Sequence, residues 1–227
     1  MLRRSPRYPF QLPFLYRVHQ VQANTPPCVG VGWTRQLSEG GVGVELGEPL
    51  SPGWFLTLHV RTAQGPLELQ AQVVWTEKPL EAGGGIPHGL VFTAADAKLL
   101  HALRDLFQVL NVFHALSGTP RAGIRLPVAI PAICHTKYPP GPMLQGRTGN
   151  ISREGMLLFL AEVLPPGTVL AVTLDTPHGP VSLEGVVVWT DASARAALEE
   201  WVRHGVQLTT RDWATALALG RLVAELA

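Results

Sequence analysis

Four arginines form two pairs with the same spacing, and their side-chain chemistry suits an anion. Arg3 and Arg7 lie near the start of the chain, and Arg121 and Arg125 lie near its middle. A guanidinium presents parallel N–H donors that bond a phosphate in pairs, and it stacks on planar rings better than an ammonium does. An RxxxR spacing is a weak pattern by itself, so the residues that follow each pair decide its meaning.

A short segment with an amide, a serine and glycine follows each arginine pair. Residues 36–41 (QLSEGG) begin 29 residues after Arg7, and residues 150–155 (NISREG) begin 25 residues after Arg125. An amide side chain donates and accepts hydrogen bonds, and serine adds a hydroxyl. The last glycine either adopts a positive φ or lets a ligand approach the backbone closely. We expect both segments to be turns between strands that hold polar groups beside the arginines.

These two segments belong to a longer internal repeat. Four matches share one offset of 114 residues without a gap, and a fifth, of residues 88–90 with 204–206, has an offset of 116. Several turn and strand matches in one register seldom arise by chance, so the chain contains two copies of a unit of about 110 residues. The four matches are 38–41 with 152–155, 50–53 with 164–167, 65–66 with 179–180, and 73–76 with 187–190.

Each copy has the pattern of several short strands. Residues 54–60 and 67–75 alternate apolar and polar side chains, as half-buried strands do, and Gly-Pro pairs mark turns. Short strands at nearly regular spacing are typical of a sandwich or a barrel. The remaining predicted strands are 29–33 and 42–46 in the first copy and 156–160, 168–174 and 181–189 in the second.

A helix is predicted at the end of each copy. Leucines at three- and four-residue spacing give residues 94–116 one apolar face, and residues 212–226 form the matching helix of the second copy. A further helical turn is predicted over residues 192–200. We therefore expect two domains, 1–117 and 118–227. The helix over 94–116 can dock on its barrel, join the domains or form a dimer, and the sequence leaves these three roles open.

Composition and charge exclude several function classes. The chain has 18 basic and 17 acidic residues in 227, so it has no global basic field to hold duplex nucleic acid or an anionic membrane. Cys28 and Cys134 are too few and too far apart for a CxxC site, and each lies in an apolar run as a small buried residue would. No secretory signal or membrane-spanning apolar stretch is visible, and we expect a cytoplasmic protein without membrane insertion.

The residue types of common active sites and metal sites do not occur at useful spacing. The eight histidines show no HxxxH or HExxH pattern, and no GxSxG elbow is present. Glu199 and Glu200 are adjacent, so they do not share a helix face as a catalytic pair. His88 and His204 are equivalent in the repeat, and we expect them at a turn or strand edge. Trp75 and Trp189, which end matching strands, are expected to pack on the barrel.

The arginine arm followed by [D/N]xSxxG on a predicted barrel resembles the PilZ family of cyclic di-GMP receptors. The resemblance covers nearly the whole chain, twice. It implies a mainly β fold, with two tandem six-stranded antiparallel PilZ-like β-barrels, each followed by a C-terminal α-helix.

The resemblance implies a cyclic di-GMP site in the second domain. This ligand carries two phosphate charges and two guanine edges, and a guanidinium bonds guanine O6 and N7 with two donors. In the first domain Gln36 replaces the expected Asp or Asn, and its longer side chain leaves binding there open. The matching residues are Arg121, Arg125, Asn150, Ser152 and Gly155 in the second domain and Arg3, Arg7, Ser38 and Gly41 in the first.

The resemblance further implies a receptor and not an enzyme, with cyclic di-GMP as its ligand and neither cofactor nor metal. Because the arm of the second copy also connects the domains, ligand binding is expected to change the domain arrangement or the contacts with a protein effector. The alternative is a PilZ-like module that binds no ligand and acts through protein contacts, for example in motility or type IV pilus control. Whether the chain forms a homodimer stays open.

Overall fold

The computed structural model describes residues 8–19, 28–62, 65–79, 82–93, 125–191, 193, 201–210 and 212–226. The chain divides into two compact units, Met1–Ile124 and Arg125–Ala227. Each unit is described by itself below. The predicted helix 94–116 and nearly all of the predicted helical turn 192–200 lie outside the described residues.

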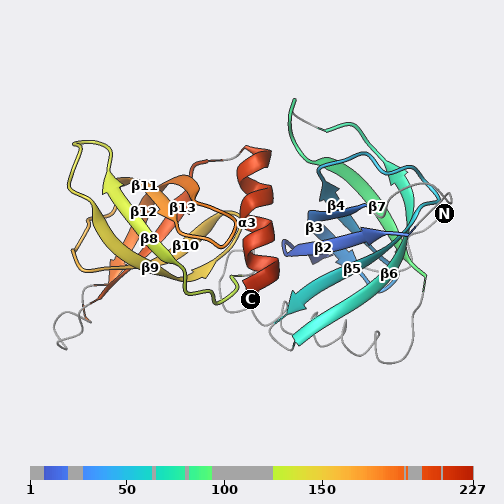
Figure 1. Ribbon diagram of the computed structural model, residues 1–227, viewed down its shortest axis with the longest axis horizontal. Coiled ribbons are helices and arrows are strands. Elements are labelled where there is room, and N and C mark those ends of the chain that lie inside the picture. Colours follow the sequence, from blue (N-terminus) through green and yellow to red (C-terminus); the bar gives the residue numbers. More distant parts are fainter. Residues whose placement is uncertain are drawn as a thin grey trace. The chain divides into compact units, whose positions relative to one another are not determined.

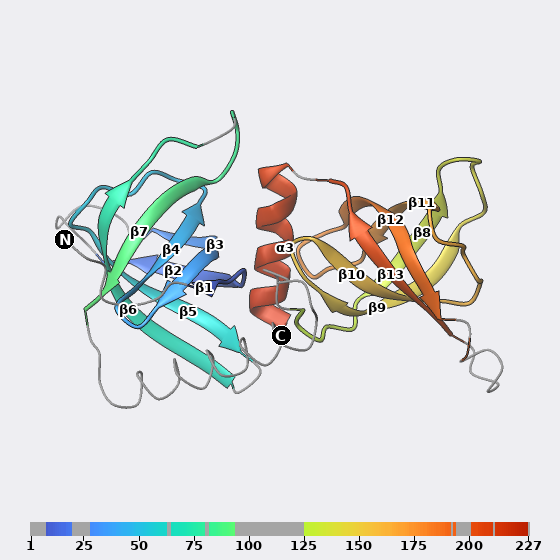
Figure 2. The same cartoon turned by 180° about the vertical axis from the view of Figure 1, so that it is seen from behind.

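The first unit contains a closed barrel. Its six strands pair antiparallel in the order β3-β2-β5-β6-β7-β4, and β4 pairs again with β3 to close the ring (Figures 1 and 2). A short strand, β1, pairs with the C-terminal part of β3, beyond the residues that pair with β2. The strands are β1 Tyr8–Pro9, β2 Pro13–Val18, β3 Val29–Ser38, β4 Gly41–Leu46, β5 Phe55–Thr62, β6 Gly65–Thr76 and β7 Ile86–Phe92.

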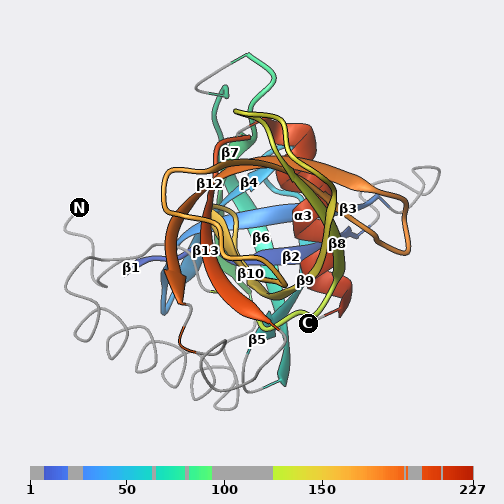
Figure 3. The same ribbon diagram turned by 90° about the vertical axis from the view of Figure 1, so that its left-hand side faces the viewer.

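The second unit repeats this barrel strand for strand. Its ring runs β10-β13-β12-β11-β8-β9 and closes through β9 and β10 (Figure 3). The strands are β8 Pro131–Thr136, β9 Leu144–Ile151, β10 Gly155–Leu160, β11 Val169–Leu174, β12 Val181–Asp191 and β13 Val202–Leu208. The prediction of a mainly β fold with two six-stranded antiparallel barrels is confirmed.

The interior of each barrel is built by alternating apolar side chains. Val42, Val44 and Leu46 of β4 are buried, and so are the matching Met156, Leu158 and Leu160 of β10. A strand places every second side chain on the same face, so these residues all point into one core. Burial of each side chain this size contributes about 1.5–3 kcal/mol relative to exposure.

Several strands were absent from the sequence prediction, among them β1, β2, β8 and β9. β2 and β8 are short, begin at proline and are mostly apolar, so they show little of the polar alternation that marks a half-buried strand. β3 also extends five residues beyond the predicted end at Trp33, as far as Ser38. This longer strand changes the position of the polar segment, as described below.

The cysteines differ in burial. Cys134 of β8 is fully buried, as predicted, and burial raises the pKa of its thiol to about 12. Cys28 is only half-buried, and its Sγ donates to the Glu48 carboxylate (3.3 Å), so the prediction of a small buried residue is wrong there. Neither cysteine forms a disulfide.

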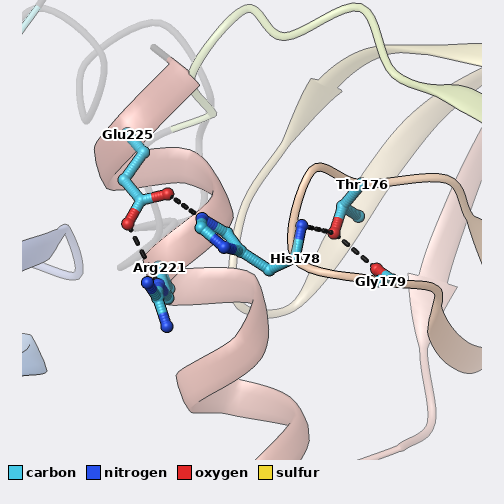
Figure 4. Close-up of polar contacts among 5 residues, drawn as sticks. All are labelled: Thr176, His178, Gly179, Arg221 and Glu225. Carbon is cyan, nitrogen blue, oxygen red and sulfur yellow. Dashed lines mark hydrogen bonds and ion pairs between the residues drawn. The ribbon is translucent and has the colours of Figure 1, made fainter.

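The C-terminal helix α3, Trp213–Leu226, begins at a capping aspartate and contacts β12. The Asp212 carboxylate accepts from the Thr215 backbone N–H (2.8 Å), which lowers the pKa of that carboxyl and satisfies one of the helix's first N–H groups. At the other end, Glu225 bonds His178 of the β11–β12 turn and Arg221 of its own helix (Figure 4). The predicted helix 212–226 is thus confirmed. Among the described residues, the structure contains no helix of the length and apolarity needed to span a membrane.

Candidate functional site

A backbone bridge joins the arginine arm of the second unit to its polar segment. Leu126 N–H donates to the Ile151 carbonyl, and Ile151 N–H donates to the Leu126 carbonyl, both at 3.0 Å. This is an antiparallel pair, so Arg125, one residue before Leu126, is set beside Ser152, one residue after Ile151. Strand β1 makes the same connection in the first unit, where Tyr8 pairs with Leu37.

A buried threonine anchors the chain just after each arm. Thr148 of β9 accepts from Ile130 N–H (3.0 Å) and donates to the Val128 carbonyl. Thr34 of β3 does the same for Leu12 (2.8 Å) and Phe10 (2.7 Å). These residues were missed by the sequence reasoning. The available signal was that both threonines fit the 114-residue offset, two positions before the amide of each polar segment.

The serine of the polar segment shapes the turn. Ser152 Oγ accepts from Gly155 N–H (3.2 Å) and donates to the Gly155 carbonyl (3.1 Å), and the Ser152 backbone N–H donates to the same carbonyl (2.8 Å). Its side chain is buried. Ser38 Oγ likewise donates to the Gly41 carbonyl (3.0 Å). In this structure each serine hydroxyl therefore stabilises the turn that connects the two strands.

The last glycine of each segment has a reason that the sequence did not reveal. Gly155 is not among the described glycines with positive φ, which are Gly53, Gly65, Gly83, Gly167 and Gly179. A Cβ on Gly155 would lie 2.6 Å from the backbone carbonyl oxygen of Val206 in β13. A Cβ on Gly41 would meet the Leu90 carbonyl of β7 in the same way. The expected positive φ is therefore wrong, and the glycine is needed because two strands approach closely.

Asn150 lies on β9 and not in a turn, contrary to the sequence expectation. It is opposite Leu157 of β10, at an irregularity in the register caused by the extra residue Gly149. Asn150 is half-buried, and its Oδ1 atom is buried without a hydrogen-bond partner. Buried polar atoms in folded proteins are nearly always paired, so this acceptor is a candidate contact for a bound molecule.

The first unit fills the corresponding place differently. Gln36 of β3 lies opposite Gly43 of β4, where the second unit has Asn150 and Leu157. A Cβ on Gly43 would be 2.9 Å from Gln36 Cγ, so the longer amide occupies the space that Leu157 fills in the other copy. A surface pocket here is lined by Gln36, Ser38, Gly41, Gly43, Trp75 and Gly89, among others.

The matching tryptophans pack on matching glycines. The indole of Trp75 lies so close to Gly89 that a Cβ there would overlap Nε1, and Trp189 lies on Gly205 in the same way. This agrees with the predicted packing role, although Trp189 keeps 39% of its surface exposed. Each tryptophan also marks a register irregularity between its strand and the next.

The two equivalent histidines are buried in strands, so the expectation of a turn or strand-edge position is wrong. Nε2 of His88 accepts from Leu50 N–H (3.0 Å), and Nε2 of His204 accepts from Leu164 N–H (3.1 Å). A backbone N–H only donates, so the proton of each neutral ring is on Nδ1, which donates to the carbonyl of Ile86 or Val202. Burial lowers the pKa of both histidines, and their role is to hold the loop after β4 or β10.

The remaining predicted site residues, Arg3, Arg7 and Arg121, lie outside the described residues. Arg125, Asn150, Ser152 and Gly155 are described and lie at one end of the β9–β10 pair, as do Gln36, Ser38 and Gly41 at the end of the β3–β4 pair. The geometry thus brings the end of an arginine arm and an amide together in the second unit, on a turn fixed by serine and glycine.

A family model described as PilZ domain matches residues 1–108 and again residues 119–225. The chain belongs to the PilZ domain family. The two matches correspond to the two copies of the repeat, and the comparison with curated proteins found no match.

Several solved structures of PilZ proteins are similar to the chain at low identity. The PilZ domain with c-di-GMP of YcgR from Escherichia coli is 19% identical, covers 52% of this chain and 99% of its own, and has a TM-score of 0.42. Bacillus subtilis MotI/DgrA, an inhibitor of motility, is 11% identical over 94% of this chain and 96% of its own, with a TM-score of 0.36. The K. pneumonia MrkH–c-di-GMP complex is 11% identical over 93% and 84%, with a TM-score of 0.35.

Proposed function

We propose that this PilZ protein is a cyclic di-GMP receptor whose principal site is in the second domain. The observation that carries the proposal is the backbone bridge between Leu126 and Ile151, because it sets Arg125 beside the NISREG segment. Two motifs that are separated in sequence thus meet at one rim, in a family of cyclic di-GMP receptors. No catalytic role is proposed.

Each residue of this site has a different role in the proposal. Arg121 and Arg125 supply guanidinium donors for phosphate and for guanine O6 and N7. Asn150 supplies an amide, whose Oδ1 atom is a buried acceptor without a partner. Ser152 and Gly155 contribute by fixing the turn, because the serine hydroxyl bonds Gly155 and the glycine permits the close approach of β13.

Titration calorimetry with cyclic di-GMP tests this proposal directly. Arg125→Ala should weaken binding by about 100-fold, because a bidentate arginine contact provides about 1–3 kcal/mol and the two phosphates lose a nearby charge. The matched variant Arg7→Ala, at the equivalent position of the first domain, should retain the high-affinity site. Undiminished affinity in Arg125→Ala would contradict the site assignment.

The first domain has a specific reason to differ. The longer side chain of Gln36 lies against Gly43, in the position that the shorter Asn150 has in the second domain. We propose that the first domain is either a weaker second site, formed by Arg3, Arg7, Gln36, Ser38 and Gly41, or a surface for a protein effector. Calorimetry on an Arg121→Ala, Arg125→Ala double variant, with and without Arg7→Ala, distinguishes these. A residual binding heat that Arg7→Ala removes would belong to a weaker first site, whereas an effector surface would leave no such heat.

Ligand binding is further proposed to change how the domains are arranged. The boundary between the two compact units falls between Ile124 and Arg125, inside the arginine arm of the second domain. The same residues would therefore bind the ligand and connect the domains, which is the arrangement of a hinge switch. Small-angle scattering should change on addition of saturating cyclic di-GMP, and an identical profile would count against domain movement.

A further inference from the structure

The turn between β9 and β10 carries a charged residue that the family motif does not specify. Arg153 follows Ser152 directly, and Ser152 lies beside Arg125 because of the Leu126–Ile151 bridge. Paired segments lie about 4.8 Å apart, so two long guanidinium side chains flank the same turn. Two arginines, with the exposed Glu154 one residue further on, therefore lie at the turn where the proposed ligand would carry phosphate.

Arg153 is held from one side by helix α3. Its guanidinium carbon lies 5.4 Å from the centre of the Trp213 ring. Stacking on an indole engages the face of a guanidinium, whereas hydrogen bonds to an anion use its edge. The contact with Trp213 therefore favours this position of the Arg153 side chain.

Trp213 is itself fixed to this part of the barrel. It is the first residue of α3, directly after the capping Asp212. The chain leading to it is tied to the same turn, because Leu208 N–H donates to the Glu154 carbonyl (2.9 Å). The start of α3 and the β9–β10 turn thus lie at the same end of the barrel, with the indole beside Arg153.

Two buried polar atoms beside this turn have no hydrogen-bond partner. They are Oδ1 of Asn150, an acceptor, and Nε1 of Trp213, a donor, and they are two of three such atoms in the described part of the chain. Asn150 is two residues before Ser152 and Trp213 lies beside Arg153, and an unpaired acceptor and an unpaired donor suit a molecule that has both kinds of group, as a guanine edge does. This observation is independent of the charge of Arg153 and indicates the same turn.

The equivalent turn of the first domain has a negative residue at the position of Arg153. Glu39 occupies the position of Arg153, and Gly40 the position of Glu154. Glu39 and Glu154 are both exposed, whereas Arg153 is half-buried against Trp213. A carboxylate at this position repels an anionic ligand, so the two turns differ in the sign of the charge nearest to Ser38 and Ser152.

We propose that Arg153, positioned by Trp213, is a further ligand-binding residue of the second domain and contacts a phosphate of cyclic di-GMP. This proposal rests on the proposed function and extends it. The C-terminal helix then completes the site, and Glu39 disfavours an anionic ligand at the matching turn of the first domain.

Calorimetry with cyclic di-GMP on the full chain tests the inference. Arg153→Glu should weaken binding at least about tenfold, while Arg203→Glu, the same charge change on β13, should leave the affinity unchanged. Trp213→Ala should give an intermediate loss, because Arg153 keeps its charge but loses its orientation. Arg153→Lys, which keeps the charge and removes the planar group, should also lose affinity and serves as a second variant if Arg153→Glu folds poorly.

The outcomes separate this inference from the proposed function. If Arg153→Glu and Arg153→Lys bind like the unaltered chain while Arg125→Ala loses binding, the inference is wrong and the receptor function stands. If the unaltered chain shows no binding, the proposed function fails and this inference fails with it. In an Arg125→Ala background, Glu39→Arg should raise the binding of the first domain several-fold, and no change would also count against the role given to this position.

Discussion

In the first barrel Gln36 lies over Gly43, and in the second Asn150 lies opposite Leu157. Both residues of the pair differ between the two copies. In the first copy a longer amide faces a smaller neighbour. The charge on the following turn has changed as well, from Glu39 to Arg153. These differences lie at the rim where the proposed ligand would bind, and they preserve the local packing while altering the groups presented there.

The frame of the two barrels has changed much less. Buried threonines at 34 and 148 anchor the chain after the arm, and buried histidines at 88 and 204 hold the loop after the next strand. A glycine at 41 or 155 admits the neighbouring strand. Packing and backbone hydrogen bonds therefore keep the same residue types at these positions in both copies. At the rim, the two copies present different side chains.

The largest expected effect concerns the close strand approach. Gly41→Ala and Gly155→Ala should each destabilise their own barrel by about 3 kcal/mol, because the added Cβ meets a backbone carbonyl that cannot rotate away. Gly40→Ala is the matched control, since a Cβ there meets nothing within 4 Å. Urea unfolding measures the three variants. A loss in only one of the two barrels would break the idea of a common frame.

An exchange of the rim pair should have an intermediate effect. With the second site weakened by Arg121→Ala and Arg125→Ala together, Gln36→Asn combined with Gly43→Leu should strengthen binding of cyclic di-GMP by the first domain about tenfold, or about 1.4 kcal/mol. The amide would then have the length and the neighbour that it has in the second domain. Calorimetry on the double variant and on each single variant checks this.

The single variants sharpen the result. Gly43→Leu alone should lower stability, because its side chain would meet Gln36. Gln36→Asn alone should leave a space beside Gly43 and strengthen binding less than the double variant does. Additive single effects would show that the two positions do not act as a pair.

The smallest expected effect comes from the two buried histidines. Each Nε2 must be unprotonated to accept its backbone N–H, and burial lowers both pKa values below about 6.5, the unfolded value. Their contribution to stability is therefore complete above about pH 6.5 and is lost as the pH falls below it, by at most about 1.4 kcal/mol per histidine and pH unit.

Thermal unfolding between pH 7.5 and 5.5 measures this loss. The lowered pKa values of the Asp212 and Glu225 carboxyls affect stability only at lower pH, near and below their usual range of about 4. His88→Gln and His204→Gln should each flatten the pH dependence of one barrel by a similar amount. A pH dependence that neither substitution reduces would show that other groups cause it.

Much of the fold was predictable because the chain repeats. The 114-residue offset, which also relates the turn residues Gly53 and Gly167, identifies two copies of one β-rich unit without any knowledge of structure. In the structure both glycines have positive φ. β2 and β8 were missed because their apolar runs begin at proline and lack clear alternation. The helix after Asp212 was predicted as the match of the helix that ends the first copy, and it begins as expected.

The candidate site was predicted in composition and not in geometry. Spacing along the chain cannot show that Asn150 lies on a strand, since that depends on how far β9 extends before its pairing with β10 ends. It also cannot show that Gly155 faces a carbonyl of β13, a strand about 50 residues away. The contact between Trp213 and Arg153 could not be predicted, because only the fold brings α3 to the β9–β10 turn.

The paired change at Gln36 and Gly43 also affects how a chain with two similar domains avoids misassembly. Neighbouring domains of related sequence can exchange strands as they fold. If β3 paired with β10, Gln36 would meet Leu157 and not Gly43, and the two side chains would overlap; if β9 paired with β4, the space beside Asn150 would stay empty. Each strand therefore fits best in its own barrel, and the divergence of the rim gives each half of the chain a means of selecting its own partners during folding.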